Sequence, residues 1–338
     1  MKSEINLIER IYSEIERIIS DARNKVVKQV NQTMVYTYYE IGRIIIENEQ
    51  NGSERAEYGK GILKNLSKRL SGEFGKGFST DNLENMRKLF LTYSKSETLS
   101  RKFQNPDFQL SWSHYIKLMR IKDETERKFY ELEAIENQWS LRELQRQSDS
   151  ALYQRLVLSR DKEKVKELSE KGLIINSPSD ALKDPYILEF IGLPDKNEYS
   201  ESELEKELID KLEAFLLELG KGFTFVARQK RITIDEKHFR IDLVFYNRLL
   251  KAFVLIDLKI GELKHQDIGQ IQMYVNYYDR YVKLDDENKT VGIILCQDKS
   301  DLLVEITLPE DNKQIFASKY QTVLPSKDEL RKLIERKK

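Results

Sequence analysis

The sequence has few of the residues that hold small secreted or zinc-binding proteins together. Its 338 residues include one cysteine, Cys296, and three histidines. A single cysteine cannot form an internal disulfide, and with so few histidines it cannot complete a Cys/His zinc cluster. Any bound metal ion must therefore be held by carboxylates and other oxygen ligands.

Long apolar runs are also missing. No stretch approaches the roughly 18 apolar residues of a membrane span. The first twenty residues, MKSEINLIERIYSEIERIIS, mix charge with apolar residues, whereas a signal peptide would have an apolar core. We therefore expect a cytoplasmic protein without a membrane partner.

Motifs for nucleotide or acyl chemistry are absent. Three Gly-Lys-Gly tripeptides occur, but none continues into the phosphate-binding pattern G-x-x-x-x-G-K-[S/T]. The sequence likewise lacks HExxH, a Rossmann fingerprint after a strand and a G-x-S-x-G elbow. We expect no nucleotide cofactor.

The charges cancel overall, with 57 basic and 57 acidic residues, but they are unevenly distributed. Eleven Lys/Arg stand against five Asp/Glu between Arg55 and Lys102, and eight against three between Lys221 and Lys251. Such runs are typical of nucleic-acid-binding surfaces and equally of solvated helix faces.

The chain length favours two domains. Residues 1–170 show helical spacing of apolar residues, so we predict a mainly helical domain there. Residues 171–199 contain three of the six prolines and are predicted to be a linker. Residues 200–338 then form the second domain.

The first basic stretch predicts two helices joined by a short KGFS turn, which is the outline of a helix-turn-helix. An ordinary helical hairpin has the same outline. In the first interpretation the turn and the second helix contact nucleic acid. The candidate residues are Lys76, Asn82, Asn85, Arg87 and Lys88.

The second domain begins with an amphipathic helix from Ser200 to Gly220. Residues 223–234, 239–246 and 252–259 are rich in Phe, Val, Ile and Thr, which predicts a three-strand meander. A helix over 266–281 and an apolar strand, TVGIILC, follow. The predicted order is α-β-β-β-α-β.

Charged residues stand at the end of a buried strand in this domain. Asp257 and Lys259 share a face because side chains alternate along a strand, and a hairpin can bring Asp242 beside them. Two close carboxylates repel each other unless a cation lies between them. Oxygen ligands suit Mg²⁺ or Mn²⁺, with the Leu258 carbonyl completing the coordination. This pattern predicts metal-dependent phosphodiester hydrolysis, in which Lys259 serves the attacking water; the alternative is a surface ion pair at a strand end.

Further side chains could serve the same site. Gln270 and Tyr274 lie one helical turn apart and therefore share a helix face. Arg228 and Lys230 alternate onto one strand face, where they would hold phosphates or simply form a solvated edge.

The segment HFRIDLVFYNRLLKAFVLIDLKIGELKHQDIGQIQMYVNYYDR resembles the nuclease core of the PD-(D/E)XK superfamily, and more closely the YhcG-type proteins. The resemblance implies that Asp242, Asp257 and Lys259 are the metal-binding acids and the lysine. Gln270 and Tyr274 match its Q-x-x-x-Y helix element. It also implies a winged-helix-like N-terminal domain and, in the helix before the sheet, an additional acid, for which we select Glu218 among several.

We therefore predict an α+β protein, with a helical, winged-helix-like domain followed by an α/β restriction-endonuclease-like domain. The predicted activity is that of a divalent-metal-dependent DNA endonuclease in repair, recombination or defence against foreign DNA, and two-strand cutting favours a homodimer. The alternative is a nuclease-fold subunit that binds DNA or recruits a partner with little cleavage of its own. An RNA nuclease ranks last, because no RNA-recognition motif is present.

Overall fold

The computed structural model describes residues 2–51, 56–94, 107–158, 162–194 and 199–324, together with 326, 330 and 334. The chain divides into two compact units, Met1–Gln145 and Arg146–Lys338. The predicted division, with a linker at 171–199, stays a prediction. No helix among the described residues is long and apolar enough to cross a membrane.

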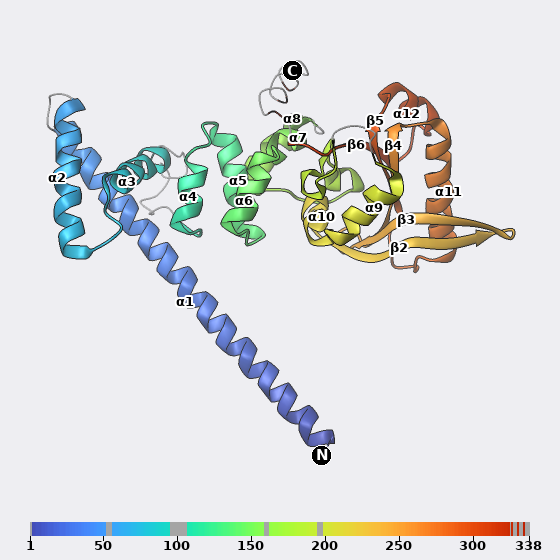
Figure 1. The fold of residues 1–338 in the computed structure, drawn as a ribbon, viewed down its shortest axis with the longest axis horizontal. Coiled ribbons are helices and arrows are strands. Elements are labelled where there is room, and N and C mark those ends of the chain that lie inside the picture. Colours follow the sequence, from blue (N-terminus) through green and yellow to red (C-terminus); the bar gives the residue numbers. More distant parts are fainter. Residues whose placement is uncertain are drawn as a thin grey trace. The chain divides into compact units, whose positions relative to one another are not determined.

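The first unit is helical, as predicted, and its helices are drawn from blue to green in Figure 1. They are α1 (Lys2–Asn51), α2 (Ala56–Phe74), α3 (Thr80–Tyr93), α4 (Trp112–Leu118), α5 (Glu124–Glu136) and the start of α6 (Leu141–Asp149).

Capping and close packing explain how these helices form. Ser79 caps α3 by accepting a hydrogen bond from the backbone of Asn82, which satisfies a donor that the first helical turn leaves free. The backbones of α1 and α3 approach so closely that a Cβ at Gly42 would lie 2.1 Å from the Met86 carbonyl oxygen. Only glycine fits this crossing.

The α2–turn–α3 unit confirms the predicted helix pair. No strand occurs within residues 2–51, 56–94 and 107–145, so the described part of this unit contains no β-wing. The winged-helix-like character of the domain stays a prediction.

The second unit contains a six-stranded sheet with helices packed against it (Figure 1). Its helices are α7 (Leu152–Leu158), α8 (Lys162–Lys171), α9 (Glu201–Asp210), α10 (Leu212–Leu219), α11 (His265–Tyr281) and α12 (Asp301–Thr307), with short 3₁₀ turns at Pro178–Ala181 and Glu189–Ile191. Its strands are β1 (Tyr186–Ile187), β2 (Phe223–Ile234), β3 (Lys237–Asn247), β4 (Ala252–Glu262), β5 (Val291–Asp298) and β6 (Ile315–Gln321).

The strand order is β1-β6-β5-β4-β3-β2. Strands β2, β3 and β4 form the predicted antiparallel meander, and β5 pairs parallel to β4. One apolar core joins the sheet to α9 and α10, and another joins its opposite face to α11. The central strand β4 is therefore covered on both faces, as its apolar sequence predicts.

The helix predicted over 200–220 is interrupted. It divides at Lys211, which ends α9 and precedes α10 with a backbone φ of −116° and ψ of 35°. Ser200 and Glu203 form a capping box at the start of α9, since each side chain bonds the other's backbone N–H. This cap fixes where α9 begins beside the end of β4.

Candidate functional site

Strands β3 and β4 bring the two predicted acids together. Leu243 of β3 is paired with Ile256 of β4 in the antiparallel register. Asp242 and Asp257 are therefore opposite each other, one residue beyond this pair. The Oδ2 atom of Asp242 accepts a hydrogen bond of 2.8 Å from the backbone N–H of Leu258. The hairpin therefore brings both carboxylates together, as the sequence predicts, but in the middle of β3 and β4 and not at their ends, because both strands continue beyond the predicted bounds.

Lys259 lies beside the second acid. Its Nζ is 2.9 Å from Asp257 Oδ2, and the Asp257 side chain is 2% exposed. This ion pair lowers the pKa of Asp257 against the effect of burial, and among the described residues no other donor bonds to Asp257 Oδ2. A buried carboxylate oxygen in this position is open to a further ligand.

Burial decides the protonation of these groups. It raises the pKa of Asp257 to about 7; the Lys259 ammonium opposes this rise and the Asp242 carboxylate adds to it. Burial also raises the pKa of Asp242, against the opposing hydrogen bond from Leu258. Burial alone would lower the pKa of Lys259, but Asp257 raises it above the ordinary value. Lys259 is therefore an ammonium at neutral pH.

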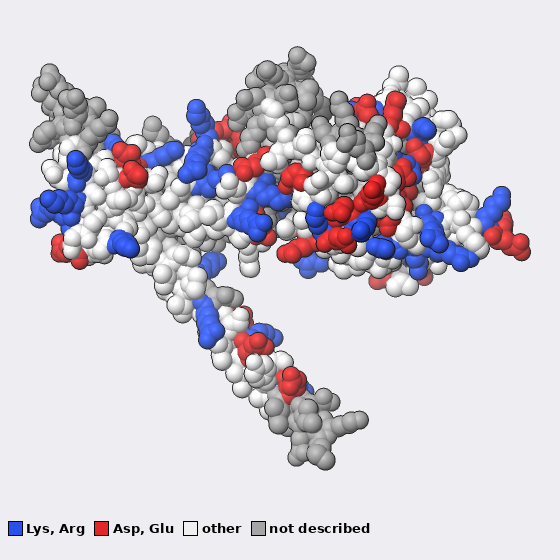
Figure 2. All heavy atoms as spheres, in the orientation of Figure 1, with Lys and Arg blue, Asp and Glu red and all other residues white. Residues whose placement is uncertain are grey.

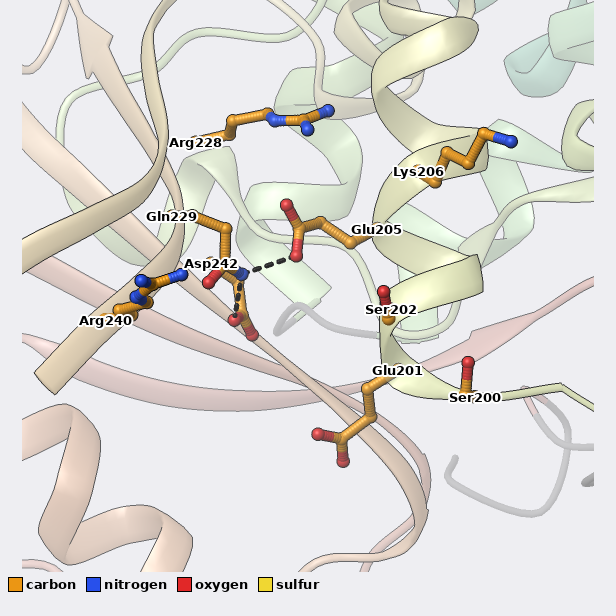
Figure 3. Close-up of a pocket in the computed structure, with 9 residues that line it drawn as sticks. All are labelled: Ser200, Glu201, Ser202, Glu205, Lys206, Arg228, Gln229, Arg240 and Asp242. Atoms are coloured by element: carbon orange, nitrogen blue, oxygen red, sulfur yellow. Dashed lines mark hydrogen bonds between the residues drawn. The ribbon is translucent and has the colours of Figure 1, made fainter.

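A cleft of about 730 Å³ opens beside Asp242 (Figure 3). Helix α9 supplies Glu201 and Glu205 to its wall. The Gln229 side-chain amide of β2 donates to both Glu205 and Asp242, which holds those carboxylates next to each other. Sequence reasoning missed Glu201, Glu205 and Gln229. The first two are one helical turn apart in ESELEKEL, which was the available signal.

Basic side chains surround these acids. Arg228 and Arg240 of the β2–β3 hairpin and Lys206 of α9 line the same cleft (Figure 3). Lys230, predicted to act with Arg228, is exposed on β2 but is not among the residues that line it. A cleft with acids at its floor and cations around them suits a phosphodiester strand and a divalent ion.

The two residues of α11 that the sequence predicts to share a helix face, Gln270 and Tyr274, contact each other. Gln270 donates to the Tyr274 hydroxyl at 2.6 Å, and that hydroxyl donates to the Arg240 carbonyl at 3.0 Å. Burial raises the pKa of Tyr274, and Asp257 and Asp242 raise it further. Tyr274 therefore stays protonated and fixes the start of the β3 segment that carries Asp242.

Glu218, predicted as an additional metal ligand, lies elsewhere. Its side chain is fully buried, and Oε1 accepts hydrogen bonds from Arg155 Nη1 at 2.6 Å and from the backbone of Ile187 at 3.0 Å. Burial alone would raise the pKa of Glu218, but Arg155, Lys183 and Arg146 hold it at about 2. The structure brings Glu201 and Glu205, and not Glu218, into the cleft with Asp242.

The residues fit a divalent cation. Apart from Lys259, the buried oxygen of Asp257 has no donor among the described residues, and the Asp242 carboxylate raises the pKa of Asp257. Within the described residues no three His, Cys, Asp or Glu side chains form a ready-made cage. Mg²⁺ is usually held by one or two carboxylates together with substrate phosphates and water, and Asp242 and Asp257 supply two carboxylates.

The nucleic-acid candidates of the first unit are separate from these residues in sequence. Lys76 and Lys88 are exposed, whereas Asn85 and Arg87 are half-buried. Asn82 accepts a hydrogen bond from Trp112 Nε1 at 2.9 Å and donates to the Gly77 carbonyl, so it stabilises the turn before α3. The exposed residues of α2 include Lys64, Lys68 and Arg69, which supply more free cationic surface than α3 does.

Comparison with known families defines the class of the protein. Residues 179–335 match the model of the YhcG PDDEXK nuclease domain, and residues 14–155 match that of the DUF1016 N-terminal domain. The second unit thus carries most of a PDDEXK nuclease domain, and the helical first unit most of the DUF1016 N-terminal domain.

A curated relative covers nearly the whole chain. The protein "Putative nuclease YhcG" of Escherichia coli (strain K12) is 37% identical over 347 aligned residues, which span 95% of this chain and 92% of the relative. The chain belongs to the YhcG family of PD-(D/E)XK nuclease-domain proteins.

Solved structures show a more limited likeness. The repair endonuclease from Pyrococcus abyssi is 16% identical over 39% of this chain and 50% of its own, with a TM-score of 0.26. A complex of EndoMS with double-stranded DNA is 17% identical over 40% of this chain and 51% of its own, also with a TM-score of 0.26.

Proposed function

We propose that this nuclease-family protein is a divalent-metal-dependent DNA endonuclease, with Mg²⁺ or Mn²⁺ as the ion. One observation carries the proposal: Asp242 and Asp257 lie on the adjacent strands β3 and β4, one residue beyond the paired Leu243 and Ile256, and Lys259 Nζ is 2.9 Å from a buried oxygen of Asp257. Roles in DNA repair, recombination or defence against foreign DNA all fit such an activity.

The metal ligands in this proposal are Asp242, Asp257 and the Leu258 carbonyl. Glu205 of α9 joins them, in place of Glu218, because Gln229 holds its carboxylate beside Asp242. A bound divalent ion would supply a nucleophilic water near neutral pH and neutralise charge on the phosphoryl oxygens.

Other side chains orient the attacking water, position the acids and bind the phosphates. Lys259, held as an ammonium by Asp257, orients the attacking water and stabilises negative charge as it develops on the phosphoryl group. Gln229 positions Glu205 and Asp242, and Tyr274 with Gln270 fixes the backbone at Arg240. Arg228, Arg240 and Lys206 bind the phosphates of the strand to be cut.

The helical domain selects or holds the DNA in this proposal. The α2–turn–α3 unit contacts phosphates through Lys76 and Lys88, joined by Lys64, Lys68 and Arg69 on α2. Asn82, Asn85 and Arg87 stay candidates of the same helix-turn-helix, winged-helix-like interpretation.

The test is cleavage of supercoiled plasmid, linear duplex, single strand, four-way junction and RNA with Mg²⁺ or Mn²⁺. We expect wild type to cut DNA, and Lys259→Ala to lower the rate by about 10²- to 10⁴-fold while leaving DNA affinity in place. Asp257→Asn should abolish metal-dependent cleavage while DNA binding remains. Lys313→Ala, which changes an exposed lysine outside the cleft, is the control.

Different outcomes separate the alternatives. Equal rates for wild type and Lys259→Ala would remove the site assignment. If neither protein cuts but both bind DNA, the recruiting-subunit function replaces the nuclease proposal, and cleavage of RNA alone would change the substrate.

A further inference from the structure

The first part of α1 exposes an unusual number of apolar side chains. Every described side chain of residues 9–30 is exposed, whereas α1 contacts α3 through buried residues that include Val35, Tyr39 and Ile46. Figure 1 shows this blue half of the helix standing clear of α2 and α3. Seven large apolar residues there are 47% to 63% exposed: Ile11, Tyr12, Ile15, Ile18, Ile19, Val26 and Val30.

These residues form one stripe. At about 100° per residue, the seven side chains and Ala22 fall within an arc of about 120°, which contains one polar residue, Gln29. An apolar stripe of that width is typical of a helix face that packs against a partner. The stripe lies on roughly the opposite side of the helix from Val35 and Tyr39, so packing onto α3 does not use it.

The charges beside the stripe indicate what covers it. Glu14 and Lys25 border one edge of the stripe, and Glu16 and Arg23 border the other. Residues 9–21 contain four acids and two bases, whereas residues 22–30 contain three bases and no acid. Figure 2 shows both charges along this helix with uncharged surface between them. The stripe therefore has one acidic half and one basic half.

We propose that residues 9–30 of two copies of this chain pair as antiparallel helices and join the protein into a homodimer. A two-fold axis between Ile19 and Ser20 brings position 14 beside position 25, and position 16 beside position 23. In a two-fold antiparallel pair each edge faces the same edge of the other copy. Glu14 then meets Lys25 and Glu16 meets Arg23, each twice, around one shared apolar seam.

Other arrangements lose this complementarity. A parallel, in-register pair places the two acidic halves side by side, with Glu16 of one copy next to Glu14 of the other, and like charges across such a seam are unfavourable. An anionic membrane surface would attract Lys25 and Arg23 but repel Glu14 and Glu16 on the same two edges, whereas the antiparallel pair gives each of these four charges an opposite partner. The proposal concerns residues outside the nuclease site and holds whether or not the protein cuts DNA.

The first experiment measures the oligomeric state of the full chain by light scattering after size exclusion. Wild type should be a dimer, and Ile19→Glu, which places a charge in the seam, should be a monomer with an unchanged circular dichroism spectrum. Val27→Glu is the matched control, because Val27 is 60% exposed but lies outside the stripe. A monomeric wild type, including one that binds anionic vesicles, overturns the proposal.

A second experiment tests the direction of pairing. Glu16→Lys alone should weaken the dimer, and Glu16→Lys with Arg23→Glu should restore it, because the swap recreates both ion pairs. Under oxidation Ile19→Cys should crosslink two copies near the axis. Val26→Cys should not, because its counterpart lies about 20 Å away in an antiparallel pair, beyond the roughly 7 Å limit of a disulfide. Efficient crosslinking at both positions contradicts the antiparallel arrangement. The native thiol, Cys296, is buried.

Discussion

At the scale of single residues, buried carboxylates divide into two kinds according to their partners. Glu218 is surrounded by Arg155, Arg146 and Lys183, and its pKa falls to about 2. Asp257 is buried with one cation, Lys259, and two acids, Asp242 and Glu201, acting on it, and its pKa rises to about 7. The charge of Glu218 is therefore paired with cations of the protein, whereas the one cation beside Asp257 does not offset the effect of its burial on the pKa.

Glu205 should contribute to metal affinity. Its pKa is raised by burial, and Gln229 ties it to Asp242. We expect Glu205→Gln to weaken Mn²⁺ binding by about 10- to 100-fold, as measured by calorimetric titration, and to slow cleavage in parallel. Glu207→Gln, two residues further along α9 and paired with Lys211, is the control. Unchanged Mn²⁺ affinity in Glu205→Gln would return this carboxylate to a structural role.

Glu218 should make the second unit sensitive to acid. Its pKa is lowered from 4.5 to about 2 in the folded protein, so the stability it contributes is present above about pH 4.5 and is lost as pH falls toward 2. Urea unfolding at a series of pH values should show a steeper loss below pH 5 in wild type than in Glu218→Gln.

The partner of this carboxylate should matter at neutral pH. Arg155→Met leaves a buried charge without its 2.6 Å ion pair, and removing one member of such a pair costs about 3–5 kcal/mol. A cost below about 1 kcal/mol would mean that Arg146 and Lys183 compensate fully.

At the scale of elements, the sequence predicts the strands better than it predicts which acid of α9 or α10 faces the cleft. Alternation and apolar content identify β2, β3 and β4 and bring Asp242, Asp257 and Lys259 together on two adjacent strands. Those side chains are positioned by local strand geometry and one hairpin, both of which are readable in the sequence.

Which acid of α9 or α10 faces the cleft depends on the break between these two helices, and the sequence pattern does not show that break. The leucine stripe runs unbroken through Lys211, where the structure changes helix axis. The closeness of Glu218 to β2 in sequence predicts a metal ligand, but its orientation toward Arg155 depends on contacts distant in sequence. Glu205 reaches the cleft only because α9 begins at the Ser200 cap beside β4. Gln229 depends on a backbone φ of 45° that no propensity predicts.

At the scale of the whole molecule, the net charge is zero, but acidic and basic side chains lie on separate surfaces. Acids concentrate in the cleft at Asp242, and cations gather around it and on the exposed residues of α2. A protein with this distribution can bind a polyanion locally without a basic isoelectric point. The two surfaces lie in the two matched domains, α2 in the DUF1016 N-terminal domain and the cleft in the YhcG PDDEXK nuclease domain.

The basic surface of α2 should contribute sequence-independent DNA affinity. Lys68 and Arg69 are exposed, whereas Arg87 is half-buried, so their removal changes charge with little effect on packing. We expect Lys68→Ala/Arg69→Ala to weaken binding similarly for unrelated duplexes, and to reduce the slope of log affinity against log salt by about 2, since each phosphate contact contributes about 0.9. Fluorescence anisotropy across a salt series measures both quantities. The double variant Lys289→Ala/Lys313→Ala, with the same charge change at exposed positions of the second unit, is the control. An equal change of slope in the two double variants would mean that net charge, and not this surface, determines DNA affinity.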